Sequence, residues 1–233
     1  FSNLNKYMHC YINLDEIKKY LVNINHIFLG KEVNAPSYYY KSDHHVNRFG
    51  SYFVYYYFMT KHNYKPIAFS DFKYKKKAIL RGSKTKISGF DGVYDEYYAP
   101  KNNKDIELYI DNNFYKFGYL NDKIIQDKFT NWNTYTETPG YCSCDKPKGN
   151  VINYSYNKNA ANKENILLIG DSQQCGVAFM FYNSFEHVYN MDHRTATNSI
   201  KKYVNDYNIS HVIYIGNIAN TFSNKNIINN WLK

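Results

Sequence analysis

The last third of the chain alternates between short apolar runs and stretches with helical spacing. The clearest run is residues 166–169 (Ile-Leu-Leu-Ile), which is typical of a strand buried on both faces of a parallel sheet. The predicted strands lie at 166–169, 187–191 and 211–215, and the predicted helices at about 173–183 and 198–207. Strands that alternate with helices predict right-handed crossovers and a parallel sheet, and hence an α/β fold.

Two earlier segments also predict helices. Apolar residues recur with helical spacing between Leu14 and Leu29, with Gly30 at the end, which indicates a packing helix. The aromatic run from Tyr52 to Met59 has no decisive period, but its position between two polar segments favours a buried helix.

The middle of the chain has a different pattern. Residues 69–119 break into short alternating pieces separated by glycines, which predicts an antiparallel or irregular insertion. Residues 121–164 are polar and poorly periodic, so we expect a long loop region or a mobile flap. A chain of 233 residues can bury one sizeable core. We therefore predict a single domain over residues 1–233, with the insertion and long loops at about 69–164 inside it.

Composition restricts the partners more than the fold. There are 27 tyrosines, and a Tyr-rich surface suits sugar binding, although the abundance of Asn, Lys and Ile throughout the chain indicates a codon bias instead. The net charge of +9 is spread along the chain, apart from the lysine cluster at 73–77. Because we find no zinc finger, RNP sequence or basic reading helix, no nucleic-acid partner is expected; attraction to an acidic polymer or a membrane surface stays open.

Cysteine usage does not indicate a cofactor. The four cysteines are Cys10, Cys142, Cys144 and Cys175. They are too few for a disulfide scaffold, and the single residue between Cys142 and Cys144 does not match zinc or redox spacing, so no metal site is predicted. The sequence has no membrane-spanning run and no signal peptide, but it opens with Phe1, so an upstream membrane tether stays open.

Polar residues follow each predicted parallel strand at its carboxyl end, where α/β sheets place their sites. They are Asp171-Ser172, Asp192-His193-Arg194 and the segment from Asn217 to Asn220. Gly170 permits a sharp turn, so Ser172 would lie at a helix N-terminus, whose N–H groups and dipole stabilise a nucleophilic oxygen or an oxyanion. The alternative is that Asp171 or Ser172 only caps the helix.

A serine nucleophile needs a base, and the base needs a carboxylate to orient it. Asp43-His44-His45 offers both groups. Residues two apart in an extended segment point the same way, so Asp43 pairs better with His45 than with its neighbour His44. Paired histidines after an aspartate are also consistent with metal ligands or a surface turn.

Four segments of the chain carry a resemblance. They are Tyr39–Tyr52, which contains Asp43-His44-His45, then Leu80–Gly89, Ile166–Ser172 and Met191–Arg194. Together they resemble the signature of the bacterial DHHW protein family, relatives of the alginate O-acetyltransferase group within the SGNH hydrolase superfamily. The resemblance spans about residues 38–220 in the family's order.

The resemblance implies a three-layer SGNH-hydrolase-like α/β fold with a central, mostly parallel sheet and a circularly permuted order of motifs. The implied site residues are Ser172 as nucleophile, His45 as base, Asp43 as its orienting carboxylate, Arg194 near the oxyanion or the substrate carbonyl, and Asn217 or Asn220 at the oxyanion. No metal or organic cofactor is implied. The segment after Ser172 also lacks the second glycine of a Gly-x-Ser-x-Gly elbow, which argues against an α/β-hydrolase.

The implied function is an extracytoplasmic, periplasmic or cell-surface serine acyltransferase or esterase. It would act on O-acetyl groups of a cell-surface or secreted polysaccharide, with an acyl donor as second substrate. Val46 stands where the family signature has Trp, and this departure keeps open a non-catalytic glycan-binding or polysaccharide-assembly protein on the same scaffold. A cysteine- or zinc-based enzyme using His44, His45, Cys142 and Cys144 is the third interpretation.

Overall fold

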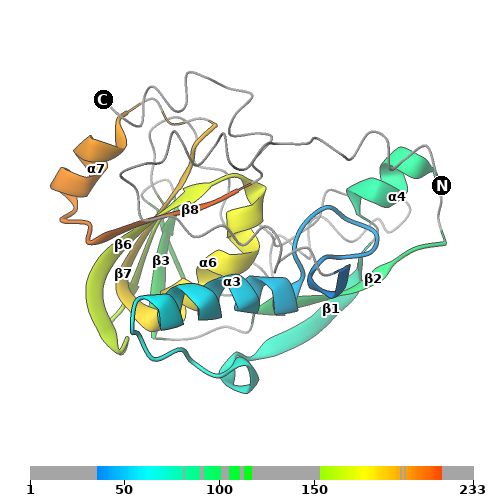
Figure 1. Cartoon of the computed structure of the whole chain (residues 1–233), viewed down its shortest axis with the longest axis horizontal. Coiled ribbons are helices and arrows are strands. Elements are labelled where there is room, and N and C mark those ends of the chain that lie inside the picture. Colours follow the sequence, from blue (N-terminus) through cyan, green and yellow to red (C-terminus); the bar gives the residue numbers. More distant parts are fainter. Residues whose placement is uncertain are drawn as a thin grey trace.

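The protein folds around a six-stranded sheet with helices on both faces (Figure 1). The computed structural model describes residues 36–80, 82–89, 92–100, 105–110, 113–116, 153–194, 196 and 198–216. The helix predicted between Leu14 and Leu29 lies outside these residues. No helix among the described residues is long and apolar enough to cross a membrane.

The sheet combines a parallel half with an antiparallel half. Its strand order is β4-β3-β5-β7-β6-β8. The bounds are β3 Ile106–Ile110, β4 Asn113–Lys116, β5 Asn153–Asn157, β6 Asn162–Gly170, β7 Phe185–Asp192 and β8 His211–Ile215. β6 runs parallel to both β7 and β8, whereas β5, β3 and β4 continue the sheet by antiparallel pairing. The predicted α/β class is therefore confirmed, and the three predicted parallel strands are neighbours.

β6 contains the apolar run that the sequence assigned to a strand. Residues 166–169 are at most 1% exposed because both faces of this strand are covered. Gly170, at the end of β6, is in register with Asp192 of β7 and Ile215 of β8, so the carboxyl ends of the three strands meet at one edge. A Cβ at Gly170 would collide with the carbonyl oxygen of Ile215, so the close passage of β8 requires glycine.

The helices among the described residues are α3 (Arg48–Lys61), α4 (Ser83–Ser88), α6 (Ser172–Ser184) and α7 (Ile200–Asp206), with short 3₁₀ turns η1 (Pro36–Tyr38) and η2 (Phe69–Asp71). α3, α6 and α7 form the layers outside the central sheet. α6 packs on one face of the sheet and α3 packs against α6, and their buried aromatic and aliphatic side chains form the main core. On the other face Tyr203 of α7 packs against Leu167, Ile169 and Met191.

α3 is the helix that the aromatic run predicted. It begins before Tyr52 because Asn47 caps it, accepting hydrogen bonds from the N–H groups of Phe49 and Gly50 at 2.9 and 3.1 Å. The Tyr55 hydroxyl is fully buried and bonds to the Ser184 hydroxyl of α6 at 2.7 Å. This bond satisfies a polar group inside the core and aligns the two helices.

β5 corrects the sequence prediction, because it lies where we expected loops. Asn153, Ser155 and Asn157 point into the structure and are buried, while Tyr154 and Tyr156 alternate on the opposite, partly exposed face. Asn157 satisfies its buried amide by donating to the carbonyl groups of residues 182 and 183 in α6. The side chains of β5 alternate between the two faces as in any strand, but the inward positions are polar. A sequence pattern without inward apolar residues predicts a loop.

A second, two-stranded sheet lies beside the central one. It pairs β1 (Tyr74–Leu80) with β2 (Asp95–Pro100) in antiparallel fashion, with α4 between them in sequence (Figure 1). The Arg48 guanidinium, at the start of α3, lies 4.1 Å from the centre of the Tyr98 ring and connects this sheet to the helical layer. The antiparallel pairing expected for residues 69–119 is present, but β3 and β4 from the same stretch join the central sheet rather than a separate insertion.

Candidate active site

Ser172 is the first residue of α6 and lies two residues after Gly170, where β6 ends. Asp171 is the N-cap, and its carboxylate accepts a hydrogen bond from the N–H of Gln173 at 2.9 Å. The capping alternative therefore applies to Asp171, while the Ser172 hydroxyl bonds elsewhere. It lies 2.8 Å from Nε2 of His45. The hydroxyl thus occupies the positive end of a helix and contacts an imidazole.

His45 joins Ser172 to Asp43 in one hydrogen-bonded chain. Its Nδ1 bonds to Oδ1 of Asp43, and its backbone N–H donates to the same oxygen at 2.9 Å. The other carboxylate oxygen accepts from the N–H of Ser83 at 2.7 Å. Both His45 and Asp43 are buried, at 5% and 1% exposure. This is the order of groups that a nucleophile, its base and the orienting carboxylate require.

The charge state of Asp43 follows from these contacts. Burial alone would raise the pKa of its carboxyl, but hydrogen bonds from the His45 side chain and from the Ser83 N–H outweigh burial and hold the pKa below its usual range. Asp43 is therefore a carboxylate at neutral pH. A buried carboxylate at Nδ1 favours the tautomer of His45 that leaves Nε2 able to accept the proton of Ser172.

The loop that carries Asp43 and His45 is held by the β1–β2 sheet. Asp95, the first residue of β2, accepts hydrogen bonds from the backbone N–H groups of Lys41 and Ser42 at 3.0 and 2.8 Å. It also accepts from the Ser42 hydroxyl at 2.6 Å, while that hydroxyl is within 3.1 Å of the carbonyl oxygen of Leu80. Sequence reasoning does not find Asp95, because its partners lie more than fifty residues away.

The Gly82-Ser83 pair, in the segment Leu80–Gly89 of the resemblance, contacts Asp43. A Cβ at Gly82 would collide with the Asp43 side chain and with the carbonyl oxygen of Ser42. Glycine at this position therefore lets the start of α4 approach Asp43 closely enough for the Ser83 N–H to bind it. The motif provided the signal for this segment, but the contact itself is visible only in the folded chain.

His44 lies beside the chain of three groups without joining it to Ser172. Its side chain is half-exposed, and its Nδ1 bonds to the Ser83 hydroxyl at 2.6 Å. Its ring lies against that of His45, tilted by 38° with 3.9 Å between the centroids. Burial lowers the pKa of His44, and the adjacent His45 lowers it further. Of the two histidines, His45 contacts Ser172 and His44 does not.

Asp43, His44 and His45 are also the set of described residues that offers three metal-ligand atoms within 4.8 Å of one another. The Nδ1 of His45 bonds to Asp43, and its Nε2 lies 2.8 Å from the Ser172 hydroxyl. Both ring nitrogens of His45 thus already have hydrogen-bond partners within the protein. The hydrogen-bonded chain to Ser172 therefore accounts for Asp43 and His45, while His44 bonds to the Ser83 hydroxyl outside that chain.

The remaining predicted site residues fall at the same edge of the sheet or outside the described residues. Arg194 follows β7, and its guanidinium donates to both carboxylate oxygens of Asp192, including a 2.5 Å bond from Nη2. Asp192 is itself in register with Gly170. The described hydrogen bonds of Arg194 thus run to Asp192 rather than to Ser172. Asn217 and Asn220 lie outside the described residues.

Val46, the departure from the family signature, belongs to the core. Its side chain is 7% exposed and packs in the main core, close to Gly50 of α3. None of the hydrogen bonds among Asp43, His45 and Ser172 involves this side chain. With Val46 in this core position, the chain of three groups is assembled.

No protein-family model and no curated protein sequence matches this chain. Solved structures are similar in fold. A DHHW family protein from Eubacterium siraeum is 18% identical with a TM-score of 0.59, over 84% of this chain and 65% of that chain. Bacillus cereus PatB1 with a sulfonyl adduct is 21% identical with a TM-score of 0.56, over 79% and 61%, and a further PatB1 structure is 22% identical with a TM-score of 0.53, over 79% and 63%.

This chain spans less than two thirds of the length of each of these proteins. At such identities the similarity shows the fold alone. It confirms the SGNH-like fold class and agrees with the DHHW resemblance of the four sequence segments.

Proposed function

We propose that this protein is a serine acyltransferase or esterase that acts on O-acetyl groups of a cell-surface or secreted polysaccharide, outside the cytoplasm. The observation that carries the proposal is the unbroken hydrogen-bonded chain from Ser172 through His45 to Asp43. Two buried side chains, His45 and Asp43, meet a partly buried serine 127 residues from His45, and the proposed nucleophile lies at a helix N-terminus.

The first step forms an acyl-enzyme. His45 Nε2 takes the proton of the Ser172 hydroxyl while Oγ attacks the acyl carbon of the donor, whose carbonyl oxygen becomes an oxyanion. Collapse of this intermediate breaks the bond to the leaving group, which receives the proton from His45. Asp43 stabilises the imidazolium that forms between these events, because its carboxylate accepts the hydrogen bond of the His45 Nδ1–H and stays ionised throughout.

The second step releases the acyl group. A sugar hydroxyl or water gives its proton to His45 and attacks the acyl carbon, and the Ser172 oxygen leaves and recovers that proton. A sugar acceptor makes the protein a transferase, and water makes it an esterase. The difference depends on how well the acceptor excludes water from the site.

Several groups are proposed to stabilise the oxyanion or bind substrate. The N–H of Ser172 belongs to the unpaired N–H groups at the start of α6, which favour negative charge. Arg194, fixed by Asp192, is proposed to bind the oxyanion or an acidic sugar. Asn217 or Asn220 is proposed as a further donor.

The substrate class rests on the resemblance to the alginate O-acetyltransferase group, supported by the similarity in fold to the DHHW family protein and PatB1. The net charge of +9 favours attraction to an acidic polymer. The competing proposal is a non-catalytic glycan-binding or assembly protein on the same scaffold, which requires no turnover.

The test uses a small chromogenic acetate and a sulfonyl fluoride. The acetate needs little of the polysaccharide site, so we expect slow, saturable release of the alcohol above the uncatalysed rate. The sulfonyl fluoride should form an oxygen–sulfur bond at Ser172 with loss of fluoride, located by peptide mass spectrometry. Absence of both turnover and labelling at Ser172 would leave the glycan-binding proposal as the better one.

For Arg194, replacement by alanine is expected to lower kcat/KM by about 10²-fold if the guanidinium binds the oxyanion, with the loss in kcat. If it binds an acidic sugar instead, KM for that acceptor should rise and the small acetate should be unaffected. Asp192→Asn, which removes the carboxylate that holds the guanidinium, should change the same kinetic constant as Arg194→Ala, kcat or KM, by a smaller factor. Unchanged kcat and KM with both kinds of substrate would exclude Arg194 from the site.

A further inference from the structure

The two halves of the proposed catalytic chain lie on separate elements. Ser172 starts α6, while His45 lies on the loop between Tyr39 and Val46, which a β-bridge between those two residues closes. The loop has no regular secondary structure to fix its distance from α6. Because a misplacement of about 1 Å can cost 10²-fold in rate, something must hold the loop in register with the helix.

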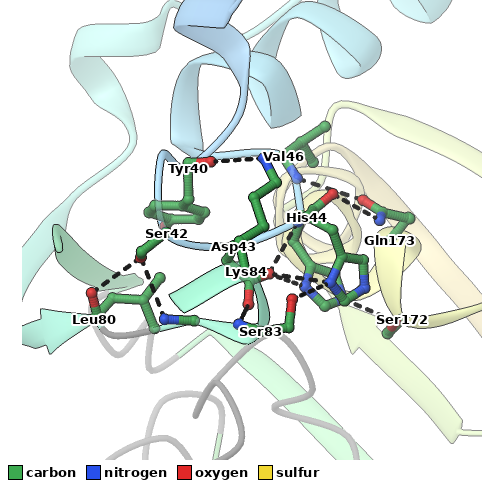
Figure 2. Close-up of polar contacts among 12 residues, drawn as sticks. Tyr40, Ser42, Asp43, His44, Val46, Leu80, Ser83, Lys84, Ser172 and Gln173 are labelled. Carbon is green, nitrogen blue, oxygen red and sulfur yellow. Dashed lines mark hydrogen bonds and ion pairs between the residues drawn. The ribbon is translucent and has the colours of Figure 1, made fainter. Parts of the chain in front are cut away.

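Gln173 makes two contacts of the required kind. Its Oε1 accepts a hydrogen bond from the N–H of Val46 at 3.4 Å, and its Nε2 donates to the carbonyl oxygen of His44 at 3.2 Å (Figure 2). These two backbone groups come from the residues on either side of His45. One carboxamide therefore binds the backbone both before and after the proposed base.

The geometry of the carboxamide makes the contact directional. Oε1 only accepts and Nε2 only donates, so the pair of bonds allows one orientation of the loop. The backbone of Gln173 is itself fixed, because its N–H donates to the capping carboxylate of Asp171. Both side-chain bonds are long, so each is weak, and their effect is to set position rather than to add much stability.

We propose that Gln173 is a positioning residue for acyl transfer, whose carboxamide holds the His45 segment in register with Ser172. This inference rests on the proposed function, and it assigns the residue after the nucleophile a role of its own. Gln173 acts through His45, so its loss should lower the rate of attack by Ser172 and leave substrate binding nearly unchanged.

The test is Gln173→Met, which keeps the length and helix propensity of the side chain and removes both hydrogen bonds. We expect kcat for the chromogenic acetate to fall by about 10- to 100-fold with KM within about twofold of wild type. The rate of sulfonyl labelling of Ser172 should fall in parallel, because it depends on the same attack. The melting temperature should stay within a few degrees of wild type.

Two further variants sharpen the test. Gln173→Glu keeps an acceptor for the Val46 N–H but cannot donate to His44 at neutral pH, so its kcat should also fall below wild type. Asn183→Ala is the control, because it removes an amide that donates to the carbonyl of Phe179 at 2.7 Å near the other end of the same helix. Its kcat and labelling rate should stay at wild-type levels.

The inference is overturned if Gln173→Met retains kcat and labelling rate within about twofold of wild type. It is also overturned if the loss of kcat is accompanied by a large fall in melting temperature, because the variant would then be partly unfolded. Failure of the proposed function looks different, because wild type itself would then show no turnover that depends on Ser172. That result would remove the positioning role together with the function.

Discussion

Ser172→Ala is expected to abolish nearly all turnover of an acetate ester, with kcat lowered by about 10³-fold or more. The oxygen that Ser172 places 2.8 Å from His45 Nε2 is the group that would form the acyl-enzyme, and alanine has no substitute for it. His45→Ala should cause a loss of similar size, because an alcohol without a base is a weak nucleophile.

Combining the two replacements should cost little beyond either one alone. Groups that act as one unit lose their function together, so the double variant would be strongly non-additive. Single-turnover release of the chromogenic alcohol measures each rate. Ser70→Ala, at an exposed serine whose hydroxyl contacts Asp71, is the matched control and should retain full activity. Additive losses, or wild-type turnover equal to that of Ser172→Ala, would contradict the mechanism.

Asp43→Asn is the second large effect, with an expected loss in kcat of about 10²- to 10⁴-fold. The Asp43 carboxylate only accepts hydrogen bonds, and it does so from His45 Nδ1 and from the N–H of Ser83. An amide at this position presents an N–H to one of these donors, which favours the wrong tautomer of His45. The pH dependence of kcat/KM for the small acetate measures the change. Asp71→Asn, at an exposed aspartate in η2, should behave as wild type.

The same variant should change the dependence of stability on acid. The pKa of Asp43 is held below its ordinary value of 3.8, so its pairing contributes stability that is fully present above that pH and is lost as pH falls below it. Asp43→Asn should therefore lose less stability than wild type between pH 7 and pH 3, measured by urea unfolding at both values. Equal losses in the two proteins, together with unchanged kcat, would show that Asp43 is not held as the structure indicates.

The elements of the C-terminal third and helix α3 could be predicted because the sequence signals for them are local. The run at residues 166–169 is apolar on both faces, and a strand covered on both sides demands that composition. The predicted strands and helices of this region are present with ends shifted by up to four residues. Because parallel strands end at the same edge of a sheet, the sequence alone predicted that Asp171-Ser172 and Asp192-His193-Arg194 lie at one edge, as they do.

β5 shows where pattern reasoning fails. Its inward positions hold Asn153, Ser155 and Asn157, and only the folded chain brings acceptors such as the carbonyl of Tyr182 to Asn157. Periodicity predicts burial of apolar residues, so it cannot recognise a strand whose buried face is polar. The single-residue spacing of Asp43 and His45, by contrast, was enough to prefer that pair over Asp43 and His44.

The sequence by itself predicted the parallel strands of the C-terminal third and the helix that begins near Ser172, because these depend on residue types within a few positions of one another. The resemblance then named the candidate nucleophile, base and carboxylate. Only the tertiary structure decided that Asp95 and Ser83 hold the loop, that Val46 is a core residue, and that Gln173 binds the backbone on both sides of His45. Each of these contacts joins residues at least forty positions apart or depends on what surrounds a side chain, and no local pattern encodes such a distance.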